Sequence, residues 1–331
     1  MNNKNTTGPK VNPLRLLDPK VAKRFLQRHQ EAIFGTDKKK IESVSVWPIK
    51  VRHRTDIYRN GFVSFFDIKT ARPKGEFRVV GYAGRKRYRT TVTTLAQLDE
   101  RTGTRPWFHI PQPLFYDVKY DTAILSYVPG HPLLNQIIRD GTMRAEHRRA
   151  LVRWLGLLDR IDPSEITTPM PGPQIDIIKK DIAQVAKEAP MHAPKILTAW
   201  EQWQKEYQQR EPTLVATLAH GDFHPINVMT SPRYDGIGII DFDLMCPAPR
   251  FWDLASFLVQ SESMFGPHLP QRVIRDMQRD ILATWEEENG KLSRADRDMI
   301  RWLSTYFRIS ILGYLFGRQG YPNMRRLYDK L

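Results

Sequence analysis

The spacing of apolar residues changes near Pro129-Gly130, and this change limits the fold classes that the sequence can adopt. Between residues 43 and 128, short runs rich in Val, Ile, Phe and Tyr alternate with turn-forming residues, which is typical of a meandering antiparallel sheet. Beyond residue 130 the apolar residues recur every three or four positions, as on one face of a helix. The sequence therefore predicts an α+β protein with a small β-rich lobe followed by a larger helical lobe.

Helix signals are found in both parts. Asp18 and Pro19 form a favourable helix start, with Asp18 as N-cap and the proline at the first helical position, and Gly35 is expected to end this helix. A second helix is expected over residues 90–100. In the helical part, Thr142 is expected to cap the first of several amphipathic helices.

We divide the sequence into three parts. Residues 1–17 are expected to form a disordered leader, residues 18–128 the β-rich lobe with its leading helix, and residues 129–331 the helical lobe. The leader lacks the apolar stretch of a secretory signal, and no run approaches the roughly eighteen apolar residues of a membrane span. Cys246 is the only cysteine, which excludes an internal disulfide or a cysteine-based zinc site. These features favour a cytoplasmic protein.

The positive charge is concentrated in the first third of the sequence. Residues 1–105 contain 24 Lys or Arg against nine Asp or Glu, whereas residues 106–331 contain 27 of each. A basic region of this kind can attract nucleic acid, anionic lipid or a phosphorylated ligand, or simply be a solvated surface. The basic runs are not interleaved with aromatic residues, so nucleic-acid binding is not favoured.

A short β pattern interrupts the helical part, and polar residues stand at its ends. The loop HGDFHPIN at residues 220–227 precedes one apolar run, and a turn leads to a second run that ends at Asp241. If the two runs form a hairpin, Asp241 returns to the neighbourhood of Asn227, which follows Asp222 by five residues. One amide and two carboxylates near a common point suit Mg²⁺ and phosphoryl transfer.

Four segments in order resemble a known family. HGDFHPINVM, IIDFD and PRFWDLASFL, with AILSYVPGHPL upstream, resemble the signature of the aminoglycoside phosphotransferase/choline kinase-like family. The resemblance extends over roughly residues 60–260 and is stronger in the helical part than in the β-rich part. It implies a protein-kinase-like bilobal fold, with a small antiparallel β lobe and a larger helical lobe. It also implies that ATP and Mg²⁺ are the cofactors.

The resemblance assigns roles to the polar loop residues. Asp222 would be the catalytic base that accepts the proton of the acceptor hydroxyl, and Asn227 and Asp241 would bind Mg²⁺. Two histidines four residues apart are more often structural than metal ligands, and the family uses them to support the loop. The expected supporting residues are His220, His224, Asp243 and Asp253.

The nucleotide-binding part departs from the family pattern. The backbone carbonyl of Ser126 and the backbone N–H of Val128 would bind the adenine, and only Gly61 suggests a glycine-rich loop. The position of the family's phosphate-binding lysine falls on Gly81 or Tyr82, and the region of its glutamate partner is rich in threonine. Other cations could serve instead. The candidates are Arg85, Lys86, Arg87 and Lys69, from which we select Lys86.

These residues predict an ATP-dependent kinase that phosphorylates a hydroxyl of a small molecule. The alternative is a pseudokinase that binds a nucleotide or an anionic partner without turnover, which the missing lysine–glutamate pair favours. The acceptor is open: no acidic excess marks an aminoglycoside site, choline would require aromatic walls, and the basic lobe would fit an anionic acceptor or partner.

Overall fold

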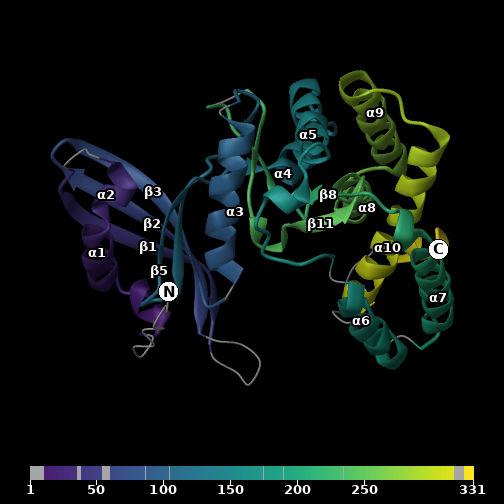
Figure 1. Cartoon of the computed structure of the whole chain (residues 1–331), viewed down its shortest axis with the longest axis horizontal. Helices are drawn as coiled ribbons and strands as arrows, with labels where there is room; N and C mark the ends of the chain where they lie inside the picture. Colours follow the sequence, from purple (N-terminus) through teal and green to yellow (C-terminus); the bar gives the residue numbers. More distant parts are fainter. Residues whose placement is uncertain are drawn as a thin grey trace. The chain divides into compact units, whose positions relative to one another are not determined.

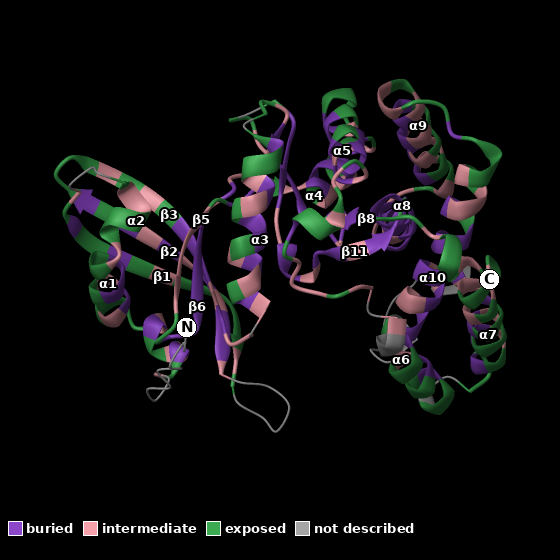
Figure 2. Cartoon of the chain, viewed as in Figure 1, coloured by how far each residue is buried: buried purple, intermediate pink, exposed green. Residues whose placement is uncertain are grey.

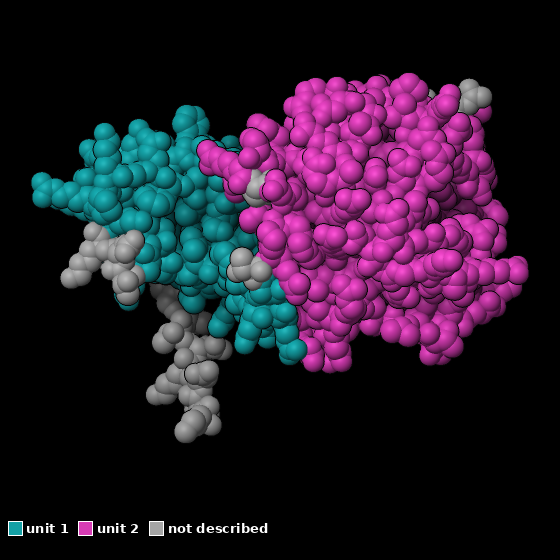
Figure 3. Space-filling model, turned by 90° about the horizontal axis from the view of Figure 1, so that it is seen from above, with its two compact units in different colours: residues 1–103, 110–128 teal, residues 104–109, 129–331 magenta. Residues whose placement is uncertain are grey.

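The computed structural model divides the protein into two compact units (Figures 1 and 3). Unit 1 comprises residues 1–103 and 110–128, and unit 2 comprises residues 104–109 and 129–331. Residues 104–109 thus belong to unit 2, although the sequence placed them in the β-rich lobe. The structure describes residues 11–35, 39–53, 60–85, 87–103, 105–173, 175–188, 190–233, 235–316 and 324–331.

Unit 1 is built on a five-stranded antiparallel sheet with the order β1-β2-β3-β6-β5. The antiparallel sheet predicted from the short apolar runs is therefore confirmed. The strands are β1 Ile41–Arg52, β2 Gly61–Ala71, β3 Lys74–Ala83, β5 Pro113–Asp117 and β6 Thr122–Ser126.

The first expected helix is present but interrupted. Asp18 caps it as predicted, because its Oδ1 accepts hydrogen bonds from the backbone N–H of Lys20 (2.7 Å) and Val21 (3.1 Å). The helix breaks at His29, where the backbone leaves the helical conformation. The ring of this residue stacks on Phe115 at 4.2 Å. The helices of unit 1 are η1 Pro13–Leu17, α1 Pro19–Arg28, α2 Gln30–Phe34 and α3 Arg87–Thr102.

Part of the expected leader is ordered. Residues 13–17 form the 3-10 helix η1, and Leu16 is fully buried in the core of unit 1. The prediction of a disordered leader is therefore wrong for these residues, because apolar Leu16 packs beneath the sheet rather than remaining in solvent. Residues 1–10 lie outside the described part of the sequence.

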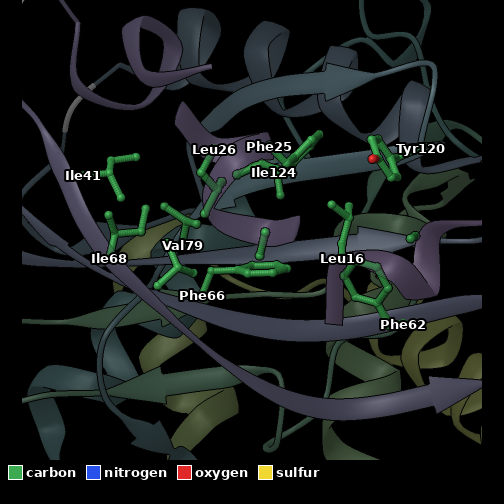
Figure 4. Packing of buried hydrophobic residues seen from close by; sticks show 13 residues of the cluster. Leu16, Phe25, Leu26, Ile41, Phe62, Phe66, Ile68, Val79, Tyr120 and Ile124 are labelled. Carbon is green, nitrogen blue, oxygen red and sulfur yellow. The ribbon is translucent and has the colours of Figure 1, made fainter. Parts of the chain in front are cut away.

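The core of unit 1 lies between α1 and one face of the sheet. Phe25 and Leu26 of α1 point toward Phe66 and Ile68 of β2, and Leu16 joins them (Figure 4). Side chains alternate between the two faces of a strand, so residues 65 and 67 lie on the face opposite to this core.

Unit 2 is mainly helical, and its described residues form two small sheets. One has the order β4-β10-β9-β7, and the other pairs β11 with β8. Its helices are α4 Leu133–Asp140, α5 Ala145–Leu158, η2 Pro163–Glu165, α6 Ile175–Glu188, α7 Ala193–Arg210, η3 Glu211–Thr213, η4 Phe242–Leu244, α8 Trp252–Phe265, α9 Gln271–Asn289, α10 Arg294–Phe316 and α11 Met324–Asp329. Its strands are β4 Phe108–His109, β7 His131–Pro132, β8 Ala216–Ala219, β9 Val228–Thr230, β10 Ile237–Ile239 and β11 Cys246–Pro249.

Helix α8 forms the centre of unit 2. It is buried on nearly every side, as are β8 and β11 beside it (Figure 2). Helix α5 begins at Ala145, and no side chain forms a capping hydrogen bond at its start. The prediction that Thr142 caps this helix is therefore wrong. No helix in the described ranges is both long and apolar enough to cross a bilayer.

Candidate functional site

The polar loop at residues 220–227 connects β8 to β9, and a carboxylate from α8 holds its start. Asp253 accepts hydrogen bonds from the backbone N–H of His220 (2.6 Å) and of Gly221 (3.1 Å). Gly221 has φ of +82°, and a Cβ there would lie 2.1 Å from the carbonyl oxygen of Leu244. Only glycine fits this turn, so the loop has one defined path out of the strand.

His220 connects the loop to the end of β10. Its ring is fully buried, and Nε2 donates to the carbonyl oxygen of Ile240 at 3.0 Å. This hydrogen bond places the ring proton on Nε2 and leaves Nδ1 as acceptor for the N–H of Asp222 at 3.4 Å. Burial lowers the pKa of His220 to about 4, so the imidazole is neutral at pH 7. Both ring nitrogens are thus engaged with backbone groups of the site.

Asp222, His224 and Asn227 lie together at the other end of the loop. The side-chain amide of Asn227 donates to the carbonyl oxygen of Asp222 at 2.9 Å. Because a carbonyl only accepts, this contact fixes the amide orientation and makes Oδ1 the end of Asn227 that can bind a cation. Nε2 of His224 lies 3.6 Å from Oδ1 of Asp222.

The carboxyl group of Asp222 is ionised at neutral pH. Burial raises its pKa, but the imidazoles of His224 and His220 and the amide of Asn227 outweigh burial and hold the pKa below its usual value. The side chain is 35% exposed, so a ligand can reach it. An ionised, accessible carboxylate can accept a hydrogen bond from a hydroxyl group.

The hairpin that the sequence predicted is present. β9 and β10 are antiparallel, with Val228 opposite Ile239, and the N–H of Ile240 donates to the carbonyl oxygen of Asn227 at 3.0 Å. Asp241 follows directly and has left-handed backbone angles, φ 68° and ψ 57°. Such angles are strained for a residue other than glycine and are frequent at functional sites. The pairing therefore brings the backbone of Asp241 next to Asn227.

The oxygens of Asn227 and Asp241 fit Mg²⁺ by their chemistry. Mg²⁺ prefers hard oxygen donors and is often bound by one or two carboxylates together with phosphate and water. Across the described ranges, no three His, Cys, Asp or Glu side chains gather as metal ligands, so a carboxylate-rich or histidine-rich centre is not found there.

Two further carboxylates lie behind the loop and are buried. Asp243, in η4, is 6% exposed, and its charge acts on His220. Burial raises the pKa of Asp253 to about 7, although its two hydrogen bonds from backbone N–H groups oppose the rise and the charges of Asp159 and Asp222 add to it. These positions support the loop from inside unit 2.

A cavity of about 550 Å³ opens beside Asp222 within unit 2. This volume is typical of small-molecule sites. Helices α6, α8 and α10 supply most of its wall, and none of the described lining residues is Lys or Arg. Lining residues include the carboxylates Asp181 and Asp222 and the aromatic residues Trp252, Tyr306, Phe307 and Tyr314.

Sequence reasoning missed most of this cavity. Asp181 and the aromatic residues of α10 belong to ordinary amphipathic helices and carry no motif. Their helical spacing indicated only a buried face. Nothing in the sequence indicated that three helices distant in the sequence leave a space beside Asp222.

The predicted nucleotide contacts lie in unit 1. Ser126 ends β6, its N–H donates to the carbonyl of Gln112 at 2.8 Å, and its hydroxyl accepts from the N–H of Gln112 at 2.7 Å. Val128 is buried. Lys86, which we selected as the phosphate-binding cation, lies outside the described residues.

Gly81 and Tyr82, the two positions expected for the family's lysine, lie on opposite faces of β3. Gly81 faces the core, since a Cβ there would lie 2.5 Å from the ring of Phe66. Tyr82 therefore points to the opposite face, where its ring meets that of Tyr88 of α3 at 5.5 Å. An aromatic contact thus joins β3 to α3 where the family pattern has an ion pair.

Two other expectations for the phosphate region change with the structure. Lys69 forms an ion pair with Glu76 at 3.1 Å. Glu76 is near the start of β3, whereas the expected lysine position is near its end, so Lys69 is a poor replacement for the missing lysine. Gly61 packs against the backbone of β3, where a Cβ would lie 2.3 Å from the carbonyl oxygen of Ala83. This close approach of the two backbones explains why position 61 is a glycine, and no phosphate-binding loop is needed to explain it.

A family model described as the phosphotransferase enzyme family matches residues 85–290, which is more than half of the sequence. The protein belongs to this family. The matched region of the phosphotransferase contains α3, residues 126–128, the polar loop and Asp253. The family predicted from the sequence segments is thereby confirmed. A search of curated protein sequences gave no match.

Solved structures confirm the protein-kinase-like fold of this phosphotransferase. Choline kinase from Cryptosporidium parvum Iowa II is 11% identical, with a TM-score of 0.58 over 94% of this protein and 92% of the other. Ethanolamine kinase from Plasmodium vivax is 12% identical, with a TM-score of 0.55 over 93% and 86%. The GDP complex of aminoglycoside 2'-phosphotransferase-IIIa is 13% identical, with a TM-score of 0.52 over 93% and 96%.

Proposed function

We propose that this phosphotransferase is an ATP-dependent kinase that phosphorylates a hydroxyl group of a small molecule bound in the cavity of unit 2. The observation that carries the proposal is the position of Asp222. This carboxylate lines the cavity and also belongs to the loop that holds Asn227, which the β9–β10 hairpin joins to Asp241. A carboxylate that can act as a base thus faces the space for an acceptor, and it belongs to the same loop as Asn227, one of the two residues proposed to bind the cation.

In the proposed mechanism, Asp222 orients the acceptor hydroxyl and accepts its proton as the oxygen attacks the terminal phosphoryl group. Its lowered pKa keeps it ionised at neutral pH, as a base must be. Asp253 and His220 hold the loop that presents it. Asn227 and Asp241 would hold Mg²⁺, which when bound neutralises charge on the phosphates.

The nucleotide contacts are proposed for unit 1. The backbone carbonyl of Ser126 would accept a hydrogen bond from the adenine, and the backbone N–H of Val128 would donate one to it. The described cations near the end of β3 are Arg85 and Arg87, with Lys86 between them in sequence. We propose that this group supplies the charge that the family's lysine gives elsewhere. Binding of a purine nucleotide is supported by the GDP complex of the aminoglycoside phosphotransferase of similar fold.

The cavity favours a neutral or cationic acceptor. Asp181 and Asp222 contribute negative charge, aromatic residues of α8 and α10 belong to the lining and are a residue type that can attract cations, and no described lining residue is basic. An anionic acceptor would meet repulsion there. The basic charge of the first third of the sequence therefore does not extend to the residues that line this cavity.

The test is an ATP-consumption screen on the full-length protein with Mg²⁺. The acceptors are choline, ethanolamine, an aminoglycoside, glucose and glucose 6-phosphate, and Asp222→Asn serves as the matched variant. We expect turnover of a neutral or cationic compound, reduced by about 10²- to 10⁴-fold in Asp222→Asn, since positioned general bases contribute this much. Equal activity of the two proteins on every acceptor would remove Asp222 from the mechanism.

A second candidate function is nucleotide binding without turnover. It is favoured by the end of β3, where neither Gly81 nor Tyr82 is the lysine that the family pattern predicts. In that case calorimetry detects Mg·ATP binding, whereas no acceptor is phosphorylated and background hydrolysis is the same in Asp222→Asn. Acceptor-dependent turnover of the wild type excludes this candidate.

A further inference from the structure

A series of polar and aromatic contacts crosses the sheet of unit 1 on the face opposite to its core. Trp47 of β1 donates through Nε1 to Oδ2 of Asp67 on β2 at 3.0 Å. Arg78 of β3 donates to both oxygens of Asp67, through Nε at 2.5 Å and Nη2 at 2.8 Å. Strands β1, β2 and β3 are therefore linked by hydrogen bonds between side chains as well as by their backbone pairing.

The guanidinium of Arg78 continues this series to the residue after Ser126. Its central carbon lies 5.0 Å from the ring centre of Phe65 and 5.2 Å from that of Tyr127. The rings of Phe65 and Tyr127 meet edge to face at 5.4 Å. Tyr127 is thus held by one cation and one aromatic ring, and the cation is itself fixed by Asp67.

An exposed ion pair alone would be weak evidence for a role, because most such pairs contribute little to stability. The pair of Asp67 and Arg78 differs in geometry, since both oxygens of the carboxylate are engaged and Trp47 adds a further hydrogen bond. The hydrogen bond from Arg78 lowers the pKa of Asp67, so the carboxylate keeps its charge. The planar fork of arginine then has one orientation, over Tyr127.

Tyr127 lies between the two residues to which we assign the adenine contacts. A side chain in contact with a fixed guanidinium and an aromatic ring limits the motion of its own backbone, and hence of the carbonyl of Ser126 and the N–H of Val128. We propose that Trp47, Asp67, Arg78 and Tyr127 form a positioning array that sets the nucleotide affinity of this enzyme. The inference rests on the proposed function, and Arg78 is its central positioning residue.

The test measures the dissociation constant of Mg·ATP by calorimetry on the full-length protein, together with thermal unfolding. Arg78→Lys keeps the charge but loses the planar fork, and we expect it to weaken Mg·ATP binding about tenfold. Arg78→Met should weaken binding at least as much. The matched control is Lys69→Met, which removes a single exposed ion pair with Glu76 on the same two strands and leaves the hydrogen bonds of Asp67 in place.

Trp47→Phe provides a second variant in case Arg78→Met does not fold. It removes only the outermost hydrogen bond, so we expect about a twofold to threefold loss of Mg·ATP affinity. The control should change affinity by less than about twofold, in line with the small value of exposed pairs.

The outcomes separate the two proposals. Weaker Mg·ATP binding in Arg78→Lys, with the unfolding temperature changed no more than in the control, supports the array. If the wild type binds Mg·ATP and folded Arg78 variants bind it equally well, the array has no positioning role and the proposed function stands. If the wild type does not bind Mg·ATP, both the proposed function and the array are wrong.

Discussion

At the scale of single residues, two buried groups at the polar loop have pKa values shifted in opposite directions, and both shifts change the stability with pH. His220 has its pKa lowered from 6.5 to about 4, so folding favours its neutral form, and its contribution to stability is lost as the pH falls from 6.5 toward 4. Asp253 has its pKa raised from 3.8 to about 7, so folding favours its protonated form, and its contribution is lost as the pH rises from 4 through 7. Between pH 4 and 6.5 the two slopes have opposite signs and largely cancel.

We therefore expect the substitution Asp253→Asn to reveal the pH dependence of stability that is due to His220. The free energy of unfolding of this variant should rise with pH between about 4 and 6.5, relative to the wild type. Its overall stability should fall by about 1 to 3 kcal/mol, because each of the two oxygens of Asp253 accepts from one N–H group of the loop and asparagine replaces one of them with a donor. Urea unfolding at a series of pH values measures both quantities. An identical pH profile in wild type and variant would contradict the raised pKa of Asp253.

At the scale of elements, the loop between β8 and β9 depends on one turn. The positive φ of Gly221 and the carbonyl oxygen of Leu244 both exclude a side chain there. Gly221→Ala should therefore destabilise the protein by about 2 kcal/mol or more, from backbone strain together with a steric clash. Because the turn leads into Asp222, activity should fall further than stability alone explains. Urea unfolding and steady-state kinetics give the two values.

The matched control for this prediction is Gly141, which follows α4. It has a similar φ of +69°, but a Cβ there would meet nothing within 4 Å. Gly141→Ala should cost about 1 kcal/mol from backbone strain alone and leave the kinetics unchanged. Equal effects of the two substitutions on activity would show that the turn at Gly221 has no special part in placing Asp222.

At the scale of the whole molecule, the proposed acceptor and nucleotide contacts belong to different units. The cavity lies wholly within unit 2, whereas residues 126–128 belong to unit 1. Asp181→Asn should therefore raise the KM of a cationic acceptor about tenfold, because it removes one carboxylate from the cavity, and leave the KM of ATP unchanged. The measurement is steady-state kinetics with each substrate varied in turn. A rise in the KM of ATP alone would contradict the assignment of Asp181 to the acceptor.

Local features of the protein could be predicted from the sequence because neighbouring residues determine them. The Asp18 cap depends on groups two and three positions away, and the β9–β10 hairpin depends on the turn between its strands. The sequence also predicted the family and the antiparallel sheet. It did not predict the break at His29, whose ring stacks on a phenylalanine that is distant in the sequence.

By itself, the sequence determined which polar residues stand at the ends of β8, β9 and β10, since short loops and turns leave them little choice of position. Only the tertiary structure decided what surrounds them. Asp253 reaches the loop from a helix more than thirty residues later, Tyr82 faces away from the core only because Gly81 faces Phe66, and the cavity exists because α6, α8 and α10 pack beside Asp222. Packing between distant segments sets these contacts, and no local pattern records it.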